Sequence, residues 1–276
     1  MLNDLHIHSS FSDGAFTPEE LLKIAEEKGI RYISITDHDT LNAYDGFSVD
    51  AASPVKVIPG LEVSTYYKGR ELHLLSYFHD PYHEELRELL EKIKTDRVDR
   101  YDRIMENLRN LGLDLPTDLP PLDSYGRAHI AKMLVSQGHV KSFQDAFDIY
   151  LDVDKLAYEK RFKIDTREAI PLLVRAGGIP VLAHPGEKLY NLHFEELLKE
   201  LKAAGLLGIE VYHPSHKKEL SNRLYGLARK YALVITGGSD FHGYRNGSTD
   251  ILGRFGVNDK LLKRLLNYKE KRGGSP

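Results

Sequence analysis

The chain has 276 residues, of which 41% are hydrophobic, so it is long and apolar enough to bury a sizeable core. It contains no cysteine, which excludes disulfides and thiolate metal sites, and any metal ion must be bound by imidazole and carboxylate groups. The formal charge of −3 argues against a globally basic surface that coats nucleic acid, and no stretch approaches the roughly 20 apolar residues of a membrane span.

Strand-like and helix-like segments alternate over most of the chain. A capping box at Thr17-Pro18-Glu19-Glu20 starts a helix that closes at Gly29. Apolar runs rich in β-branched residues predict seven strands, around Leu2–His8, Tyr32–Thr36, Val55–Val63, Glu71–Phe78, Ile179–Ala183, Gly208–Tyr212 and Leu233–Thr236. Later helices are predicted from Thr166, as the N-cap, to Gly177, and at Phe194–Ala204, Lys217–Tyr231 and Asp259–Tyr268. This alternation predicts a parallel sheet, open or closed, with functional residues at the carboxyl ends of the strands.

Residues 79–164 depart from this alternation. Apolar residues recur there at three- to four-residue steps from Leu86 to Leu108, and a proline-containing connection follows at Leu113–Pro121. Shorter helices are predicted near Ala128–Ser136 and Ser142–Tyr150. The sequence therefore predicts an α/β domain made of residues 1–78 and 165–276, with a helical insertion at 79–164.

Acidic residues and histidines gather at or just after the apolar runs. The motifs are Asp4-Leu5-His6-Ile7-His8, Thr36-Asp37-His38, Gly60-Leu61-Glu62, Leu72-His73-Leu74, Leu182-Ala183-His184-Pro185 and Gly238-Ser239-Asp240-Phe241-His242. In His6-x-His8 and Asp240-x-His242, residues two apart on a strand point to the same face and can share a site. With Asp13, these motifs supply enough nitrogen and oxygen donors for more than one metal ion. Closely spaced cations neutralise phosphate charge and activate water, so phosphoester hydrolysis is the reaction that the motifs favour.

The ordered set of motifs resembles the PHP (polymerase and histidinol phosphatase) family of metal-dependent phosphoesterases. Thr36-Asp37-His38-Asp39-Thr40, Gly237-Gly238-Ser239-Asp240-Phe241-His242 and the insertion after His73 resemble one branch of it. That branch removes phosphate from nucleoside 3′,5′-bisphosphates and trims short RNA from the 5′ end. The resemblance implies a distorted seven-stranded (β/α) barrel (PHP fold) whose helical insertion acts as a substrate cap.

The resemblance also implies three divalent metal ions, with manganese as the first choice and iron or zinc also compatible. The first ion would take His6, His8, Glu62 and Asp240; the second would share Glu62 and add His73 and His184; the third would take Asp13, His38 and His242. Glu62 suits the bridging role because a carboxylate has two oxygens. Glu62, Asp240 and His242 would act in catalysis by holding a metal-bound hydroxide that attacks phosphorus.

Substrate phosphate would be bound by Arg127, His129 and His213. Arg127-Ala128-His129 lies where the resembled branch carries Arg-Pro-His, and arginine can grip two phosphate oxygens. The alternatives are a helix-start salt bridge for Arg127, a capping or surface role for His129 and a structural loop role for His213. Tyr158-Glu159-Lys160-Arg161 departs from the Tyr-Val-Pro segment common in that branch.

Several other polar residues have two interpretations. Asp37 and Asp39 flank His38 and would either orient it or bond backbone amides. His79, His83, His139 and His193 match no motif and are predicted to be surface histidines.

The leading functional hypothesis is hydrolysis of nucleotide phosphomonoesters, first of all nucleoside 3′,5′-bisphosphates, together with 5′-to-3′ hydrolysis of short RNA. The alternatives are a histidinol-phosphate phosphatase, a PHP-type DNA exonuclease and a non-enzymatic, metal-dependent sensor of a phosphorylated ligand. The expected partner is a small phosphorylated substrate, with no stable nucleic-acid complex and no membrane; the oligomeric state is left open. The first motif lies so close to Met1 that a signal peptide is not expected, which favours a cytoplasmic location.

Overall fold

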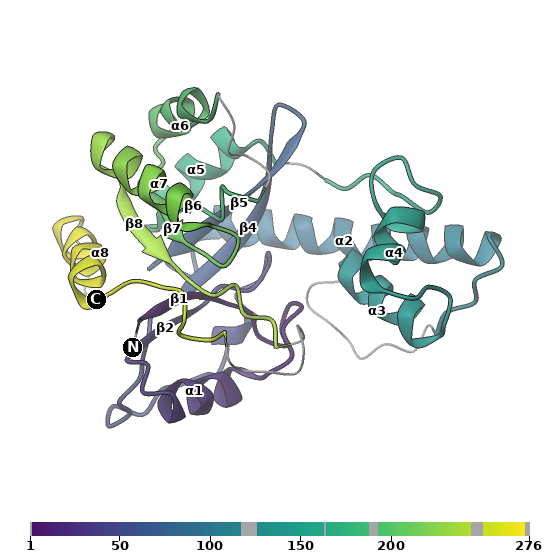
Figure 1. Cartoon of the computed structure of the whole chain (residues 1–276), viewed down its shortest axis with the longest axis horizontal. Coiled ribbons are helices and arrows are strands. Elements are labelled where there is room, and N and C mark those ends of the chain that lie inside the picture. Colours follow the sequence, from purple (N-terminus) through teal and green to yellow (C-terminus); the bar gives the residue numbers. More distant parts are fainter. Residues whose placement is uncertain (1, 117–125, 163, 188–192, 244–250, 274–276) are drawn as a thin grey trace. The chain divides into compact units, whose positions relative to one another are not determined.

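The computed structural model of the chain describes residues 2–116, 126–162, 164–187, 193–243 and 251–273 (Figure 1). The chain forms two compact units, the first made of residues 1–87 and 163–276 and the second of residues 88–162. The sequence placed the corresponding boundaries at 78/79 and 164/165. No helix among the described residues is long and apolar enough to cross a membrane.

The described strands of the first unit form two sheets. The smaller sheet has the parallel order β1-β2-β3, with β1 at Asp4–Ile7, β2 at Tyr32–Ile35 and β3 at Lys56–Val57. The larger sheet has the order β4-β5-β6-β7-β8, and its members are β4 (Gly60–Tyr67), β5 (Arg70–Tyr77), β6 (Ile179–Leu182), β7 (Gly208–Tyr212) and β8 (Val234–Gly237). The prediction of a purely parallel sheet is wrong, because β5 pairs antiparallel with both β4 and β6.

The single strand predicted at Val55–Val63 is also wrong. Pro59, which has no N–H for a strand ladder, separates β3 from β4, and β4 continues to Tyr67. The two residues between β4 and β5 are Lys68 and Gly69, both with positive φ (48° and 81°). Two such residues are typical of a type I′ hairpin turn, whose twist matches that of the paired strands. The tight Lys68-Gly69 turn therefore makes β4 and β5 antiparallel neighbours.

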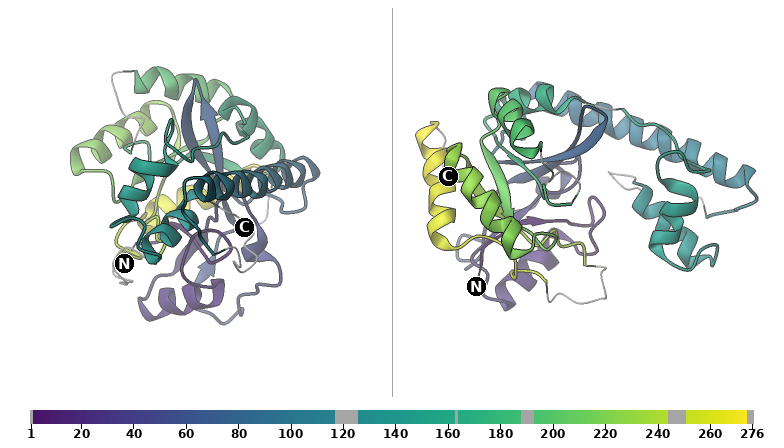
Figure 2. Two further views of the ribbon diagram at one scale, coloured as in Figure 1. Left: turned by 90° about the vertical axis from the view of Figure 1, so that its right-hand side faces the viewer. Right: turned by 45° about the horizontal axis from the view of Figure 1, so that its top comes forward.

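The helices of the first unit agree closely with the prediction. They are α1 (Pro18–Glu27), α5 (Thr166–Arg175), α6 (Phe194–Ala203), α7 (Lys218–Lys230) and α8 (Asp259–Lys271), with a 3-10 turn, η1, at Asn42–Tyr44. The capping box of α1 is confirmed, since Thr17 and Glu20 exchange backbone and side-chain hydrogen bonds. Thr166 is not the N-cap of α5; the Asp165 carboxylate accepts from Arg167 N instead. Figures 1 and 2 show α7 and α8 beside β7 and β8.

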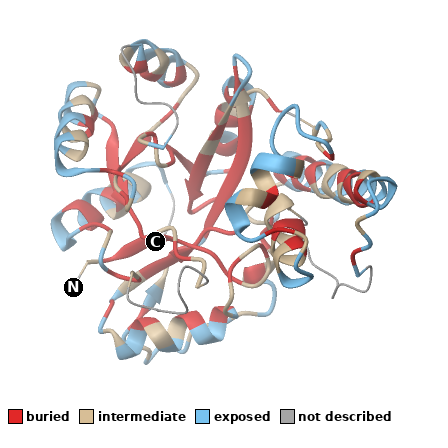
Figure 3. Ribbon diagram, turned by 45° about the vertical axis from the view of Figure 1, so that its right-hand side comes forward, coloured by how far each residue is buried: buried red, intermediate tan, exposed pale blue. Residues whose placement is uncertain are grey.

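The core of the first unit lies along its strands. Figure 3 shows the strands buried over most of their length, whereas the helices expose their outer faces. Two isolated parallel bridges, Ile7↔Phe241 and His38↔Glu62, connect segments of the smaller sheet with segments of the larger one. The ends of β1, β2 and β8 and the first residues of β4 are thereby brought side by side.

The described elements of the second unit are helices. This unit contains most of α2 (Glu84–Asn110), then α3 (Arg127–Ser136), α4 (Phe143–Ala146) and a π-helical turn, η2 (Phe147–Leu151). Its own buried cluster includes Ile104, Leu108, Ile130 and Leu134. The predicted connection Leu113–Pro121 lies outside the described residues from position 117 onward.

Candidate metal centre

The motifs His6-x-His8 and Asp240-x-His242 lie next to each other, because the Ile7↔Phe241 bridge pairs their middle residues. His8 N donates to the Phe241 carbonyl at 2.9 Å, and Asp240 N donates to the His6 carbonyl at 2.8 Å. This interleaving puts the Asp240 carboxylate 3.4 Å from His6 Nε2 and 3.1 Å from His8 Nε2. The two-residue spacing in each motif thus serves one shared site.

Glu62 is the centre of this site. The His38↔Glu62 bridge fixes its backbone, and its side chain is fully buried. Five histidine rings lie 3.0–3.3 Å from its carboxylate: His6, His8 and His38 face Oε2, whereas His73 and His184 face Oε1. Burial alone would raise the pKa of Glu62, but the surrounding histidines outweigh burial and hold that pKa well below its usual range.

All nine predicted ligands come together in the first unit. Their donor atoms fall into groups whose members lie within 4.8 Å of one another: His6, His8, Glu62 and Asp240; His8, Asp13, His38 and His242; and His38, Glu62 and His73. The first group has the same members as the first predicted ion site. The third group differs from the second predicted ion site, because it contains His38 in place of His184. His184 nevertheless contacts Glu62, at 3.0 Å.

The donor set fits divalent cations. Both ring nitrogens of His8 and Nδ1 of His38 are buried, and none of the three makes a hydrogen bond within the described part of the chain. Burial lowers the pKa of His8, but the Asp240 and Glu62 carboxylates outweigh it and raise the pKa to about 10. Without a cation, protons on imidazole balance these buried carboxylates. A metal ion bound by imidazole and carboxylate would displace those protons.

A second layer of carboxylates supports the donors. Glu210 Oε1 lies 3.1 Å from His6 Nδ1, and Glu71 Oε1 lies 3.1 Å from His73 Nε2. Asp37 accepts from Ser9 N and from the Ser9 and Ser12 hydroxyls, which orders the loop that leads to Asp13. Neither Glu210 nor Glu71 was singled out by sequence reasoning. The available signal for Glu210 was a carboxylate within an apolar strand pattern, because a buried acid requires a partner.

The predicted phosphate ligands lie in both units. In the first, His213 Nε2 is 3.5 Å from Asp240 Oδ2, and its side chain is 3% exposed. In the second, Arg127 donates to the Leu151 carbonyl and pairs with Asp152 at 3.3 Å, while His129 Nδ1 accepts from Gly126 N. These local contacts match the alternatives weighed for Arg127 and His129. Phosphate binding by all three side chains stays a prediction.

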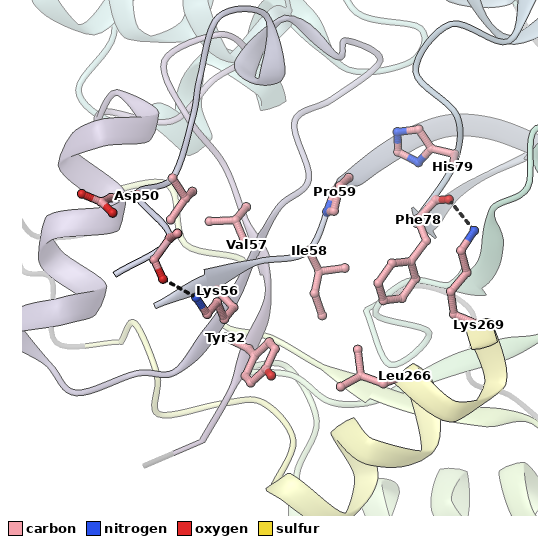
Figure 4. A pocket seen from close by; sticks show the side chains of 12 residues that line it. Tyr32, Asp50, Lys56, Val57, Ile58, Pro59, Phe78, His79, Leu266 and Lys269 are labelled. Atoms are coloured by element: carbon pink, nitrogen blue, oxygen red, sulfur yellow. Dashed lines mark hydrogen bonds between the residues drawn. The ribbon is translucent and has the colours of Figure 1, made fainter. Parts of the chain in front are cut away.

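A separate cavity of about 610 Å³ lies between β3 and α8 (Figure 4). Ile58, Phe78, His79 and Lys269 are among its lining residues, and none of the nine predicted metal ligands lines it. The surface location predicted for His79 is wrong, since this residue is only 4% exposed. Burial lowers its pKa to about 4, so the imidazole is neutral near pH 7.

Sequence comparison agrees with this geometry. A 5′-3′ exoribonuclease of Haemophilus influenzae is 33% identical over 246 residues, which cover 87% of this chain and 89% of that protein. A phosphoribosyl 1,2-cyclic phosphate 1,2-diphosphodiesterase of Eggerthella lenta is 31% identical, with 88% and 95% covered. A 3′,5′-nucleoside bisphosphate phosphatase of Chromobacterium violaceum is 31% identical, with 90% of each chain covered.

The fold is likewise shared with a solved structure. A candidate metal-dependent phosphoesterase from Bifidobacterium adolescentis superposes with a TM-score of 0.82 at 29% identity, covering 99% of this chain and 96% of that one. The PHP domain family model matches residues 4–166, which include six of the nine predicted metal ligands. The chain belongs to the PHP domain family.

Proposed function

We propose that this chain, a metal-dependent phosphoesterase, hydrolyses phosphomonoesters of nucleotides and also the phosphodiester bonds of short RNA. Nucleoside 3′,5′-bisphosphates are the first substrate class, and short RNA hydrolysed from the 5′ end is the second. The observation that carries the proposal is the convergence of five histidines on the buried Glu62 carboxylate, with Asp240 and Asp13 beside them. The names of the Haemophilus and Chromobacterium relatives support the nucleotide class.

Three divalent ions, with manganese as the first choice, are part of the proposal. Among the described residues four donor groups are found, and the three that contain Glu62 or His8 support this number; the fourth consists of Glu187, His213 and Asp240. When bound, the ions would neutralise charge on the phosphoryl oxygens and lower the pKa of water. Glu62 would hold two ions at once, because its Oε2 faces His6, His8 and His38 while its Oε1 faces His73 and His184.

The substrate phosphate is proposed to contact His213, Arg127 and His129, with the second unit acting as a substrate cap. His213 stands beside Asp240, within the set of donors. Within the second unit, burial together with the charges of Arg127, Arg161 and Arg97 lowers the pKa of Arg100 to about 10. Four arginines near one another supply the positive charge that a dianionic phosphate requires.

A closed barrel is the architecture that we propose for the first unit. The bridges Ile7↔Phe241 and His38↔Glu62 support closure, because each joins segments of the two sheets. Strands β3 and β4 occupy the place of one of the seven predicted strands. In such a barrel the ligands from separate strands would encircle one end.

The test measures phosphate release from adenosine 3′,5′-bisphosphate and from histidinol phosphate, and release of nucleoside 5′-monophosphates from a 5′-phosphorylated RNA oligomer and a matched DNA oligomer. Phosphoribosyl 1,2-cyclic phosphate tests the activity that the Eggerthella relative's name describes. Each substrate is assayed with manganese and again after chelation. Preference for the bisphosphate or RNA, abolished by chelation, is the expected result. Preference for another substrate would reassign the substrate class, and no turnover of any substrate would favour the sensor alternative.

A further inference from the structure

Glu210 is a fully buried carboxylate inside the apolar strand β7. Its two oxygens have different partners: Oε1 lies 3.1 Å from His6 Nδ1, and Oε2 accepts from the backbone N–H of His184 at 2.7 Å. Burial would raise the pKa of Glu210, but the charge of His6 and the hydrogen bond to it lower that pKa. Because a buried carboxylate is costly unless it is well bonded, an apolar side chain would be expected here if Glu210 had no specific task.

The contact with His6 determines which ring nitrogen is available to a metal ion. A carboxylate can only accept, so His6 must carry a hydrogen on Nδ1 to satisfy Glu210. The other nitrogen, Nε2, lies 3.2 Å from Glu62 Oε2 and 3.4 Å from Asp240 Oδ1. In the neutral imidazole, the Nε2 lone pair is then directed into the donor group of His8, Glu62 and Asp240.

The contact with His184 acts on the backbone. His184 has a φ of +22°, an unfavourable conformation for a residue with a side chain. Its N–H is held by Glu210, and its ring Nε2 lies 3.0 Å from Glu62 Oε1. The Glu210 carboxylate therefore holds both His184, which follows β6, and His6 of β1.

We propose that Glu210 is a positioning residue that fixes the tautomer of His6 and the backbone of His184, and thereby couples the two sides of the Glu62 carboxylate. The inference rests on the proposed function, since it assumes that His6 and His184 bind metal ions. Glu210 itself touches neither substrate nor metal in this assignment.

The test variant is Glu210→Gln, which keeps the size of the side chain. His6 and His184 face different oxygens of Glu210, and a glutamine in the same place has an oxygen at only one of these two positions. Its NH₂ group at the other position then faces a donor. We expect Mn²⁺ affinity to fall about 10- to 100-fold for at least one ion, measured by calorimetric titration of metal-stripped protein. Glu219→Gln, an exposed change in α7, is the matched control and should bind Mn²⁺ like the wild type.

A measurement on the unaltered protein covers the case in which the variant does not fold. With Zn²⁺ as a diamagnetic probe, nitrogen NMR of the histidine rings should show His6 protonated at Nδ1 and metal-bound at Nε2. Metal on Nδ1 of His6, or unchanged Mn²⁺ affinity in a folded Glu210→Gln variant, would overturn the coupling alone. If the wild-type protein binds neither Mn²⁺ nor Zn²⁺, both the proposed function and the coupling are overturned.

Discussion

At the scale of single residues, Glu62 is the carboxylate that lies beside five of the site histidines. Replacing it by Glu62→Gln removes its negative charge but keeps the shape of the side chain, and it leaves five histidines around a neutral amide. We expect phosphate release to fall on the order of 100-fold or more while the protein stays folded, because metal ions lose their shared ligand. Steady-state assays with circular dichroism check this, and Glu27→Gln, an exposed change in α1, is the control. Unchanged turnover would contradict the assigned centre.

The nine donor residues could be selected from the sequence because their types suit metal binding, most of them lie in motifs at or just after apolar runs, and they follow the order of the resembled family. Glu210 could not be selected in this way. Its partners, His6 and His184, belong to other strands, so its role depends on which strands are neighbours and in what register. The sequence of one strand does not contain that information. A lone acid within Gly208–Tyr212 was the only local sign.

At the scale of elements, the site depends on how closely the segment after β8 approaches β1. A Cβ on Gly238 would lie 2.3 Å from His6 Cβ and 2.4 Å from His6 N, so Gly238→Ala must push the two segments apart. We expect a loss of roughly 1–3 kcal/mol in the free energy of unfolding, together with weaker Mn²⁺ binding. Gly226→Ala in α7, where a Cβ meets nothing within 4 Å, should instead be stabilising by about 0.5–1 kcal/mol. Urea unfolding and calorimetric titration with Mn²⁺ test the two variants. Equal stability of Gly238→Ala and Gly226→Ala would contradict the close approach of Gly238 to His6.

Most helices and strands were predictable at this scale, because periodicity and capping are local properties. The α1 capping box and the extent of α3 and α6 show this. The direction of β5 was not recognised, although Lys68-Gly69 between two β-rich runs is a hairpin signal. Ending the preceding strand at Val63 hid that signal, because the connection then looked too long for a tight turn.

At the scale of the whole molecule, the pairing of distant segments decides where the ligands meet and which polar residues are buried. The parallel bridges at Ile7 and His38 join residues far apart in sequence, and no local pattern specifies them. His79 is a second example. It follows β5 in what looks like a polar loop, but α8 covers that region, and Lys269 bonds the Phe78 carbonyl beside it.

The burial of His79 should make the stability of the protein depend on pH. Its pKa in the folded protein is lowered to about 4 from 6.5, chiefly by burial and also by the charge of Lys269, with the Ser76 backbone and Asp80 acting in the opposite direction. Between these two pH values the unfolded chain binds a proton that the folded chain does not, so stability is complete above pH 6.5 and is lost as the pH falls toward 4. From pH 7.5 to pH 5 this loss amounts to about 2 kcal/mol.

The variant His79→Phe isolates this contribution. Phenylalanine cannot titrate, and the adjoining cavity of about 610 Å³ gives its ring room (Figure 4). Urea unfolding in the presence of a chelator, at pH 7.5 and pH 5, should show a smaller loss of stability in the variant than in the wild type. The metal-site histidines and carboxylates also titrate, but they do so in both proteins, so the difference between the two losses reports on His79. Equal losses would mean that His79 is not held neutral by burial.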